Sequence, residues 1–191
     1  MNGKILLLVD CQYDFINGTL AVNGAEEAMN KLAEFIRSNG KEYDKIILTA
    51  DWHPQTHCSF KDNGGIWPMH CVQHSKGAAI YQSILDALND IKADYIVVTK
   101  GLNEEHEEYS VFKNELSRDI IVDICNHLKP QVINVCGIAY DYCVGDSVKD
   151  GLKTLPNVNF TVLKEYSPAI SENTENDFTK FIENSERVWL V

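Results

Sequence analysis

The chain has 191 residues, of which 45% are hydrophobic and 24% charged, with only 11 glycines and 5 prolines. This composition excludes a disordered or fibrous protein, and the length suits one domain with its own core. Seventeen basic against 28 acidic residues give a net charge of −11, which argues against nucleic-acid and anionic-membrane partners. No apolar run approaches the length of a membrane span, and the first run, 5–9, is too short for a signal peptide. We therefore expect a cytoplasmic protein.

Short runs rich in β-branched residues alternate along the chain with stretches of helical periodicity. The predicted strands are residues 4–10, 45–51, 94–100, 131–137, 158–165 and 187–191. They are apolar nearly throughout, which is typical of strands buried on both faces of a parallel sheet. The predicted helices are residues 24–38, 78–91, 118–127, 140–152 and 173–183. We expect a single α/β domain over 1–191, with an open, mostly parallel sheet of about six strands and helices on both faces.

One long loop, residues 52–75, interrupts this alternation and contains four histidines. Because residues i and i+2 of an extended segment face the same way, Asp51 and His53 can chelate one ion. His70, carried back by the loop, would supply a third ligand, and His57 is either a fourth ligand or a pocket residue. One carboxylate with two imidazoles describes a catalytic type of Zn²⁺, Mn²⁺ or Fe²⁺ site. An Asp-x-His pattern alone is a weak signal.

Polar residues also stand where the predicted strands end. Asp10 ends the first strand, Lys100 ends the third, and Cys143 falls in the first turn of the predicted helix 140–152. The carboxyl ends of parallel strands share one edge of a sheet, where ligands bind. A helix N-terminus and a nearby ammonium both favour a thiolate, so we expect Cys143 to be a nucleophile and Asp10 its proton acceptor. The alternative is a cysteine simply packed into a helix start.

The chain contains six cysteines, which could form three disulfides in an oxidising compartment. Without a secretory signal they are better interpreted as reduced thiols. Cys125 and Cys136 lie among apolar neighbours and are expected to be small buried hydrophobes.

Five segments carry a resemblance to a known family. They are residues 9–15 (VDCQYDF), 51–54 (DWHP), 67–71 (WPMHC), 99–101 (TKG) and 137–144 (GIAYDYCV). In this order they resemble the motifs of nicotinamidases, a branch of the isochorismatase-like cysteine hydrolases with a three-layer α/β/α fold. The Asp–Lys–Cys set marks the superfamily, and the histidine-bearing loop marks the nicotinamidase branch.

The resemblance implies a catalytic triad of Asp10, Lys100 and Cys143. It also implies a cis peptide bond before Ala139, with the N–H groups of Ala139 and Cys143 forming an oxyanion hole. The family's pyridine ring lies between aromatic walls, which match Phe15, Trp67 and Tyr109.

The same resemblance implies one divalent transition-metal ion on Asp51, His53 and His70, with His57 ligating in some members. Zinc is the expected metal, with manganese and iron as alternatives. The implied reaction is hydrolysis of nicotinamide to nicotinate and ammonia through a cysteine thioester, in NAD salvage. The expected partner is this small molecule, with no nucleic acid or membrane, and assembly into a homo-oligomer is left open.

Three other functions compete with this interpretation. Another hydrolase of the superfamily, acting on a different small amide or ether, would share the triad, but such relatives generally lack the metal loop. A non-catalytic metal-binding protein needs no cysteine at a helix start, and a thiol-redox sensor would want a second cysteine beside Cys143. The chain also departs from the family pattern at Cys11, Tyr13, Tyr140 and residues 74–77. The acidic stretch 104–108 is expected to be a solvated loop near the pocket mouth.

Overall fold

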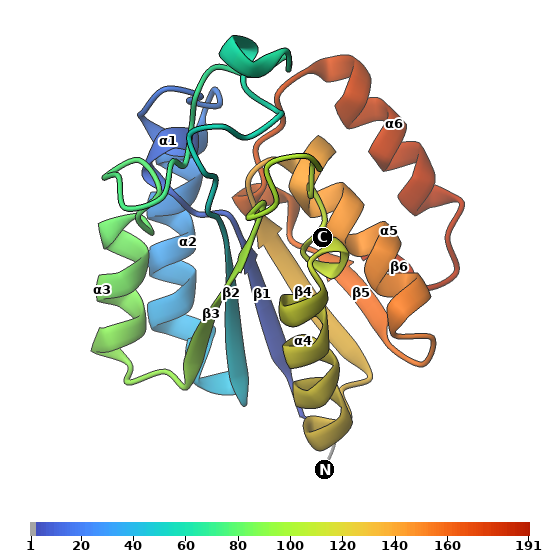
Figure 1. Cartoon of the computed structure of the whole chain (residues 1–191). Coiled ribbons are helices and arrows are strands. Elements are labelled where there is room, and N and C mark those ends of the chain that lie inside the picture. Colours follow the sequence, from blue (N-terminus) through green and yellow to red (C-terminus); the bar gives the residue numbers. More distant parts are fainter. Residues whose placement is uncertain (1–2) are drawn as a thin grey trace.

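The structure is a computed structural model that describes residues 3–191. Six parallel strands form one open sheet in the order β3-β2-β1-β4-β5-β6 (Figure 1). The strands are Ile5–Val9 (β1), Lys45–Asp51 (β2), Tyr95–Lys100 (β3), Val132–Gly137 (β4), Asn159–Val162 (β5) and Val188–Leu190 (β6). The predicted α/β class and the parallel sheet are confirmed, and every strand pair is parallel.

The central strand β1 shows why these segments form a sheet with two covered faces. All five of its residues are buried. Because successive side chains of a strand point to opposite faces, this burial means that both faces of the sheet are covered. Leu6 and Leu8 enter one hydrophobic core, and Leu7 and Val9 enter the other. Burying each such side chain contributes about 1.5–3 kcal/mol, which favours this continuous apolar run at the centre of the sheet.

The helices divide between the two faces of the sheet. They are Tyr13–Ile16 (α1), Ala25–Asn39 (α2), Gln82–Asp90 (α3), Glu115–Leu128 (α4), Gly145–Thr154 (α5) and Glu172–Glu183 (α6). Helices α2 and α3 cover one face, and α4, α5 and α6 cover the other (Figure 1). The helix α1 is a single turn, too short to show a periodic pattern in the sequence. None of the helices within residues 3–191 is long and apolar enough to cross a membrane.

Most predicted boundaries differ from the structure by one to five residues, and three of these differences have a clear local reason. The helix expected from residue 78 begins at Gln82, because residues 78 and 79 lie in a turn and a bend, and Ile80 forms a bridge with Gln12. The strand expected to reach residue 165 ends at Val162, where a 3₁₀ turn over Lys164–Tyr166 follows. The helix expected from residue 140 begins with a π turn, Tyr140–Val144, before α5 continues it.

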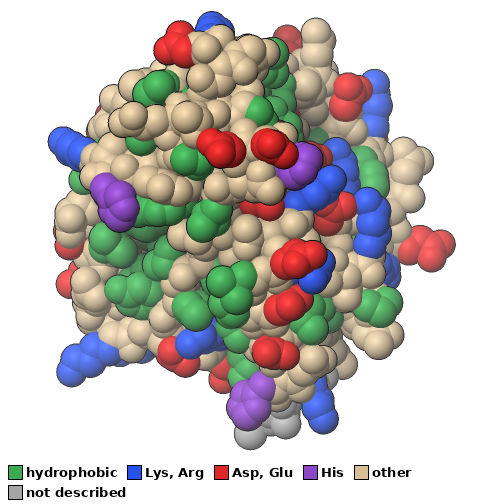
Figure 2. Space-filling model, viewed as in Figure 1, with side chains coloured by type: hydrophobic (Ala, Val, Ile, Leu, Met, Phe, Trp, Pro, Cys, Tyr) green, Lys and Arg blue, Asp and Glu red, His purple; other side chains and the backbone are tan. Residues whose placement is uncertain are grey.

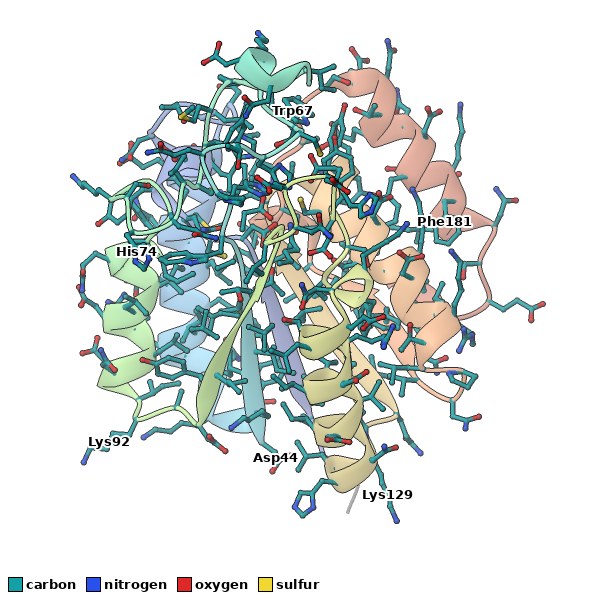
Figure 3. The ribbon with its side chains drawn as sticks, viewed as in Figure 1. Asp44, Trp67, His74, Lys92, Lys129 and Phe181 are labelled. Carbon is teal, nitrogen blue, oxygen red and sulfur yellow. The ribbon has the colours of Figure 1, made fainter. Side chains whose placement is uncertain are left out.

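The strand order places a crevice at one edge of the sheet. The chain winds outward from β1 through β2 to β3 and then returns to β4 on the other side of β1. At such a reversal the loops after the two central strands separate, and α/β proteins bind ligands there. Trp67 of the long loop lies over this edge, whereas Asp44, Lys92 and Lys129 mark the opposite one (Figure 3). The outer face that α4 presents carries charges of both signs (Figure 2).

Candidate active site

Asp10, Lys100 and Cys143 meet at this edge, as the sequence predicts. The Lys100 Nζ atom lies 2.9 Å from the Asp10 Oδ2 atom and 3.5 Å from the Cys143 Sγ atom. Asp10 and Lys100 are completely buried, and Cys143 is 6% exposed. Asp10 follows β1 and Cys143 follows β4, so the carboxylate and the thiol flank the point where the sheet order reverses.

The orientation of Asp10 is fixed by its neighbour in β2. Asp10 has a φ of +49°, in the left-handed region that Asp tolerates better than most residues. Its N–H donates to the Thr49 side chain at 3.1 Å, and the Thr49 hydroxyl donates to the Asp10 Oδ1 atom at 2.5 Å. The Oδ2 atom is therefore left to face Lys100. Sequence reasoning gave Thr49 no role, although a polar residue within the apolar run 45–51 was a signal.

Burial and the close opposite charges together set the pKa values of Lys100 and Asp10. Lys100 makes ion pairs with Asp10 and with Asp51, whose Oδ1 atom lies 2.5 Å from the Nζ atom. Although burial opposes the charge, these two carboxylates raise the pKa of Lys100 well above its usual value. Burial also raises the pKa of Asp10, even though Lys100 lowers it. Asp10 is therefore a stronger base than a solvated carboxylate.

The resting state of Cys143 differs from the sequence-based expectation of a stabilised thiolate. Burial raises the pKa of Cys143 well above its usual value, since Lys100 alone does not offset desolvation and the nearby Asp10 and Asp51 carboxylates. One oxygen of each carboxylate and the Cys143 sulfur lie within 4.8 Å of one another. The thiol therefore keeps its proton at rest, and Asp10 is within reach to remove it.

Asp51, His53 and His70 form a second buried cluster beside the first. One ligand atom of each lies within 4.8 Å of the others, which is the spacing that a single metal ion requires. The Nδ1 atom of His53 lies 2.9 Å from the Gly101 carbonyl, and that of His70 lies 2.8 Å from the Pro68 carbonyl. Because carbonyls only accept hydrogen bonds, both rings carry their proton on Nδ1 and present the Nε2 lone pair.

Two further observations agree with a metal at this cluster. The Nε2 atom of His53 is buried and has no hydrogen-bond partner within the described chain. A buried polar atom without a partner is costly, and a metal ion would satisfy it. Gly101 has a φ of +67°, and a side chain there would clash with the His53 ring. This glycine thus lets the backbone carbonyl approach and orient the ligand.

His57 lies outside the cluster that could hold the metal. Its ring packs on that of His53, with centroids 4.0 Å apart. Its Nδ1 atom lies 2.7 Å from the Ser59 hydroxyl and accepts the Ser59 N–H at 3.3 Å, so Ser59 occupies this side of the ring. Burial and the neighbouring His53 lower the pKa of His57 to about 4, so the ring is neutral. His57 does not line the cavity either, and its packing favours a role in supporting the His53 ring over that of a fourth ligand.

Two side chains of the first motif, to which sequence reasoning gave no role, support the cluster of Asp51, His53 and His70. Gln12 holds the backbone of Asp51, accepting from its N–H at 2.8 Å and donating to its carbonyl at 2.8 Å. Asp14 accepts a hydrogen bond from the Cys71 N–H at 2.7 Å, directly after His70. The loop after β1 therefore positions two of the candidate metal ligands.

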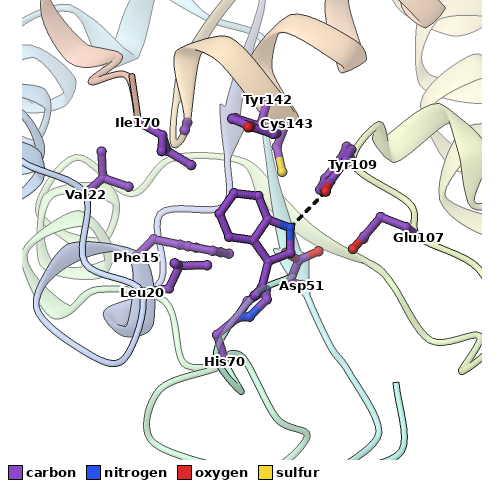
Figure 4. Close-up of a pocket in the computed structure, with 12 residues that line it drawn as sticks. Phe15, Leu20, Val22, Asp51, His70, Glu107, Tyr109, Tyr142, Cys143 and Ile170 are labelled. Carbon is purple, nitrogen blue, oxygen red and sulfur yellow. Dashed lines mark hydrogen bonds between the residues drawn. The ribbon is translucent and has the colours of Figure 1, made fainter. Parts of the chain in front are cut away.

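The two clusters open into a small pocket, whose empty space is about 360 Å³ when the solvent at its mouth is included. Its lining residues are Phe15, Leu20, Val22, Asp51, Trp67, His70, Glu107, Tyr109, Ala139, Tyr142, Cys143 and Ile170 (Figure 4). Ala139 follows a cis peptide bond, as the resemblance implied. The lining is mostly apolar, with Cys143 on one side and the metal-type cluster on another.

Three aromatic side chains close the cavity. The Trp67 indole N–H donates to the Tyr109 hydroxyl at 2.8 Å (Figure 4). The Tyr142 ring meets both edge-on, with centroids 5.3 Å from Trp67 and 5.5 Å from Tyr109. Sequence reasoning proposed Trp67 and Tyr109 as walls and missed Tyr142, which lies next to Cys143 in the motif.

The acidic stretch 104–108 is not the fully solvated loop that the sequence predicted. The Glu104 carbonyl accepts from the Cys58 N–H at 2.8 Å, and Glu108 accepts from the Gly101 N–H at 2.7 Å. Glu107 lines the cavity. Only part of the stretch faces solvent, because the loop packs on residues beside the metal-type cluster.

Of the departures from the family pattern, Tyr140 is explained by packing. Its ring is completely buried, lies 4.8 Å from that of Phe178 in α6, and its hydroxyl pairs with Thr179. It therefore stabilises α6 and does not enter the cavity.

Comparison with known proteins identifies the family of this chain. The isochorismatase domain family matches residues 4–182. The chain belongs to the isochorismatase family. It is 32% identical to the nicotinamidase of Escherichia coli, over 83% of this chain and 81% of that protein. It is 29% identical to the nicotinamidase of Saccharomyces cerevisiae, over 90% and 91% of the two chains.

Solved structures of this family agree in fold. The pyrazinamidase of Pyrococcus horikoshii, in complex with zinc, aligns with a TM-score of 0.82 at 27% identity, over 99% of this chain and 98% of that one. PnC1 from L. infantum, in complex with nicotinate, aligns with a TM-score of 0.86 at 27% identity, over 100% and 92%.

Proposed function

We propose that this protein is a nicotinamidase, which hydrolyses nicotinamide to nicotinate and ammonia. The observation that carries the proposal is the buried Asp10–Lys100–Cys143 group facing an aromatic cavity beside the Asp51, His53 and His70 cluster. The relatives named as nicotinamidases cover most of the chain and support the same substrate. A planar, neutral, aromatic amide suits a cavity whose lining is largely apolar and aromatic.

In the first half of the reaction the amide nitrogen leaves. Asp10 takes the proton of the Cys143 thiol, and the resulting thiolate attacks the carboxamide carbon. The charge that develops on the carbonyl oxygen is stabilised by the backbone N–H groups of Ala139 and Cys143, an interaction typically worth about 3 kcal/mol per donor. Asp10 then gives its proton to the departing ammonia, which leaves a thioester on Cys143.

In the second half, water replaces the sulfur. Asp10 accepts a proton from the attacking water, the bond between carbon and sulfur breaks, and the proton returns to the Cys143 thiolate. The carboxylic acid gives up its proton to the released ammonia or to solvent and leaves as nicotinate, and the resting thiol is restored. Lys100 keeps its charge throughout, because its pKa lies well above neutral pH, and it holds the Asp10 carboxylate beside the sulfur.

Asp51, His53 and His70 would hold one divalent metal ion, for which zinc is the first candidate. Such an ion would supply a Lewis acid beside the cavity, able to bind a ring nitrogen of the substrate. Phe15 and Trp67 line the same cavity as Cys143 and would confine the flat ring there.

A related hydrolase acting on another small amide or ether is the second candidate, since it would use the same three catalytic residues. Purified protein loaded with zinc is assayed for ammonia release from nicotinamide, alongside the variants Cys143→Ala and Cys125→Ala. Cys125 is a matched control, because it is a buried cysteine of α4 that does not line the cavity. We expect turnover by the wild type and by Cys125→Ala and none by Cys143→Ala. A wild type that does not hydrolyse nicotinamide would overturn the substrate assignment.

A further inference from the structure

Ile170 lines the cavity but comes from outside every motif that the sequence analysis singled out. It lies in the segment between β5 and α6, and 39% of the residue is exposed. Its side chain is one wall of the pocket that contains Cys143. Figure 4 shows Val22 and Ile170 at one end of this pocket, and Asp51 and Glu107 at the other. The pocket therefore has an apolar end and a polar end.

The position of Ile170 is fixed by Asp141, a buried residue of the π turn that carries Cys143. The Oδ1 atom of Asp141 accepts the Ile170 N–H at 2.9 Å. The Oδ2 atom accepts the Ser171 N–H at 3.1 Å and the Thr174 hydroxyl at 2.5 Å. These hydrogen bonds join the start of α6 to the turn that holds the nucleophile.

The segment is anchored on the other side of Ile170 as well. The Tyr140 N–H, in the same π turn, donates to the Pro168 carbonyl at 2.9 Å. Isoleucine is also branched at Cβ, which restricts the rotation of its side chain. Ile170 is therefore a fixed wall, although it lies at the surface end of the pocket.

The proposed substrate has two groups that the site would hold. The carboxamide lies at Cys143, and a metal ion on the cluster of Asp51, His53 and His70 would bind the ring nitrogen. Only the 5-position of the ring is next to neither the nitrogen nor the carbon that carries the carboxamide. This edge of the ring is the part left to meet the apolar end of the pocket, where Ile170 lies.

We propose that Ile170 limits the size of the ring that the cavity accepts, and that Asp141 is the positioning residue that holds this wall in place. The inference rests on the proposed function, because it assumes that the ring is a pyridine carboxamide. It narrows the substrate class to rings without a bulky group at the 5-position. One methylene more or less in a hydrophobic pocket changes specificity about 10–200-fold, so the shorter side chain of Ile170→Ala should admit such a group.

The test measures kcat/KM of the zinc-loaded protein for nicotinamide and for 5-ethylnicotinamide. Leu190→Ala is the matched control, because Leu190 is 37% exposed and does not line the cavity. We expect the ratio of the 5-ethyl amide to nicotinamide to rise about tenfold in Ile170→Ala and to stay within about twofold in Leu190→Ala. Both amides use the same Cys143 chemistry, so a general loss of activity cancels in this ratio. An unchanged ratio in Ile170→Ala would overturn the proposal.

A second measurement separates binding from chemistry. In the Cys143→Ala background, titration with each amide gives its dissociation constant directly. Adding Ile170→Ala is expected to tighten 5-ethylnicotinamide about tenfold relative to nicotinamide. Equal shifts for the two amides would contradict the role of Ile170.

The role of Asp141 is tested through the same ratio of kcat/KM values. We expect Asp141→Ala to raise the ratio, and Thr174→Val, which removes a single hydrogen bond to Asp141, to raise it less. Combining Asp141→Ala with Ile170→Ala is expected to give the ratio of Ile170→Ala alone, because the wall is then already gone. Additive effects would refute the positioning role. A wild type without nicotinamide turnover would instead contradict the proposed function, so the two failures are distinguishable.

Discussion

The Gln12 side-chain amide and the Asp51 backbone are joined by two hydrogen bonds, each 2.8 Å long. The same Gln12 amide also donates to the Ala78 carbonyl at 2.8 Å, and the side chain is completely buried. Gln12, in the loop that follows β1, thus fixes the end of β2, from which the candidate metal ligand Asp51 projects. Partners of this kind orient ligands, and their loss typically weakens metal binding about 10–100-fold.

Replacing Gln12 with methionine is therefore expected to reduce zinc affinity by at least tenfold. The change keeps the volume but leaves the Asp51 N–H and carbonyl and the Ala78 carbonyl without their partner, which costs about 1–3 kcal/mol of stability per orphaned group. Competition with a zinc chelator measures the affinity, and denaturant unfolding measures the stability. Gln82→Met on the exposed side of α3 is the control. Wild-type zinc affinity in Gln12→Met would contradict the positioning role.

The candidate ligands are tested by two histidines of the same loop. His70 belongs to the buried cluster, whereas His74 is exposed and packs against Trp52. We expect elemental analysis to find about one zinc ion per chain in the wild type and in His74→Ala, and far less in His70→Ala, because removing one of three ligands opens the site. Full zinc content in His70→Ala would exclude this residue from the ligand set.

Lys100 is expected to be essential for stability as well as for activity. Lys100→Met leaves the Asp10 and Asp51 carboxylates buried without a countercharge, and breaking a buried pair in this way typically costs about 3–5 kcal/mol. The variant Lys153→Met removes an exposed ion pair with Asp150 instead, which contributes far less to stability because water screens it. Thermal unfolding at neutral pH, without added metal, compares the two. Equal losses of stability in both variants would contradict the account.

The pH dependence of wild-type stability follows from the same ion pairs. Asp10 and Asp51 raise the pKa of folded Lys100 above the usual value of 10.5. Its contribution is therefore fully present below that usual value and is lost as the pH rises through the higher folded value. We expect the melting temperature to fall on this alkaline side in the wild type, and this fall to be missing from Lys100→Met. A fall of the same size in Lys100→Met would assign it to other groups.

The fold was predictable because its signals are local. Apolar runs such as residues 45–51 match β2 at both ends, and the β/α alternation indicated a parallel sheet. The strand order was not predictable, since it depends on contacts between segments that are distant in sequence. It is this order that brings Asp10 and Cys143 together at the reversal between β1 and β4.

The site was predictable where a residue type carries its own chemistry. Asp51, His53 and His70 are such residues, and the structure brings them within reach of one ion. Residues that act through geometry were missed. Thr49 gains its role only because β2 packs beside β1, and Glu107 reaches the cavity only because the acidic loop packs against residues beside it. The sequence predicted a thiolate at Cys143, whereas burial in the structure raises the pKa of this thiol. The prediction failed because the sequence does not show how completely the side chain is buried.

The central claim is that Cys143 carries the acyl group. Zinc-loaded protein is mixed with excess nicotinamide, quenched in acid within the first turnovers, digested and analysed by mass spectrometry. We predict a mass increase of one nicotinoyl group on the peptide that contains Cys143, removable by hydroxylamine and missing from Cys143→Ala. A nicotinoyl group on any other residue, or nicotinate formation by Cys143→Ala at the wild-type rate, would contradict the mechanism.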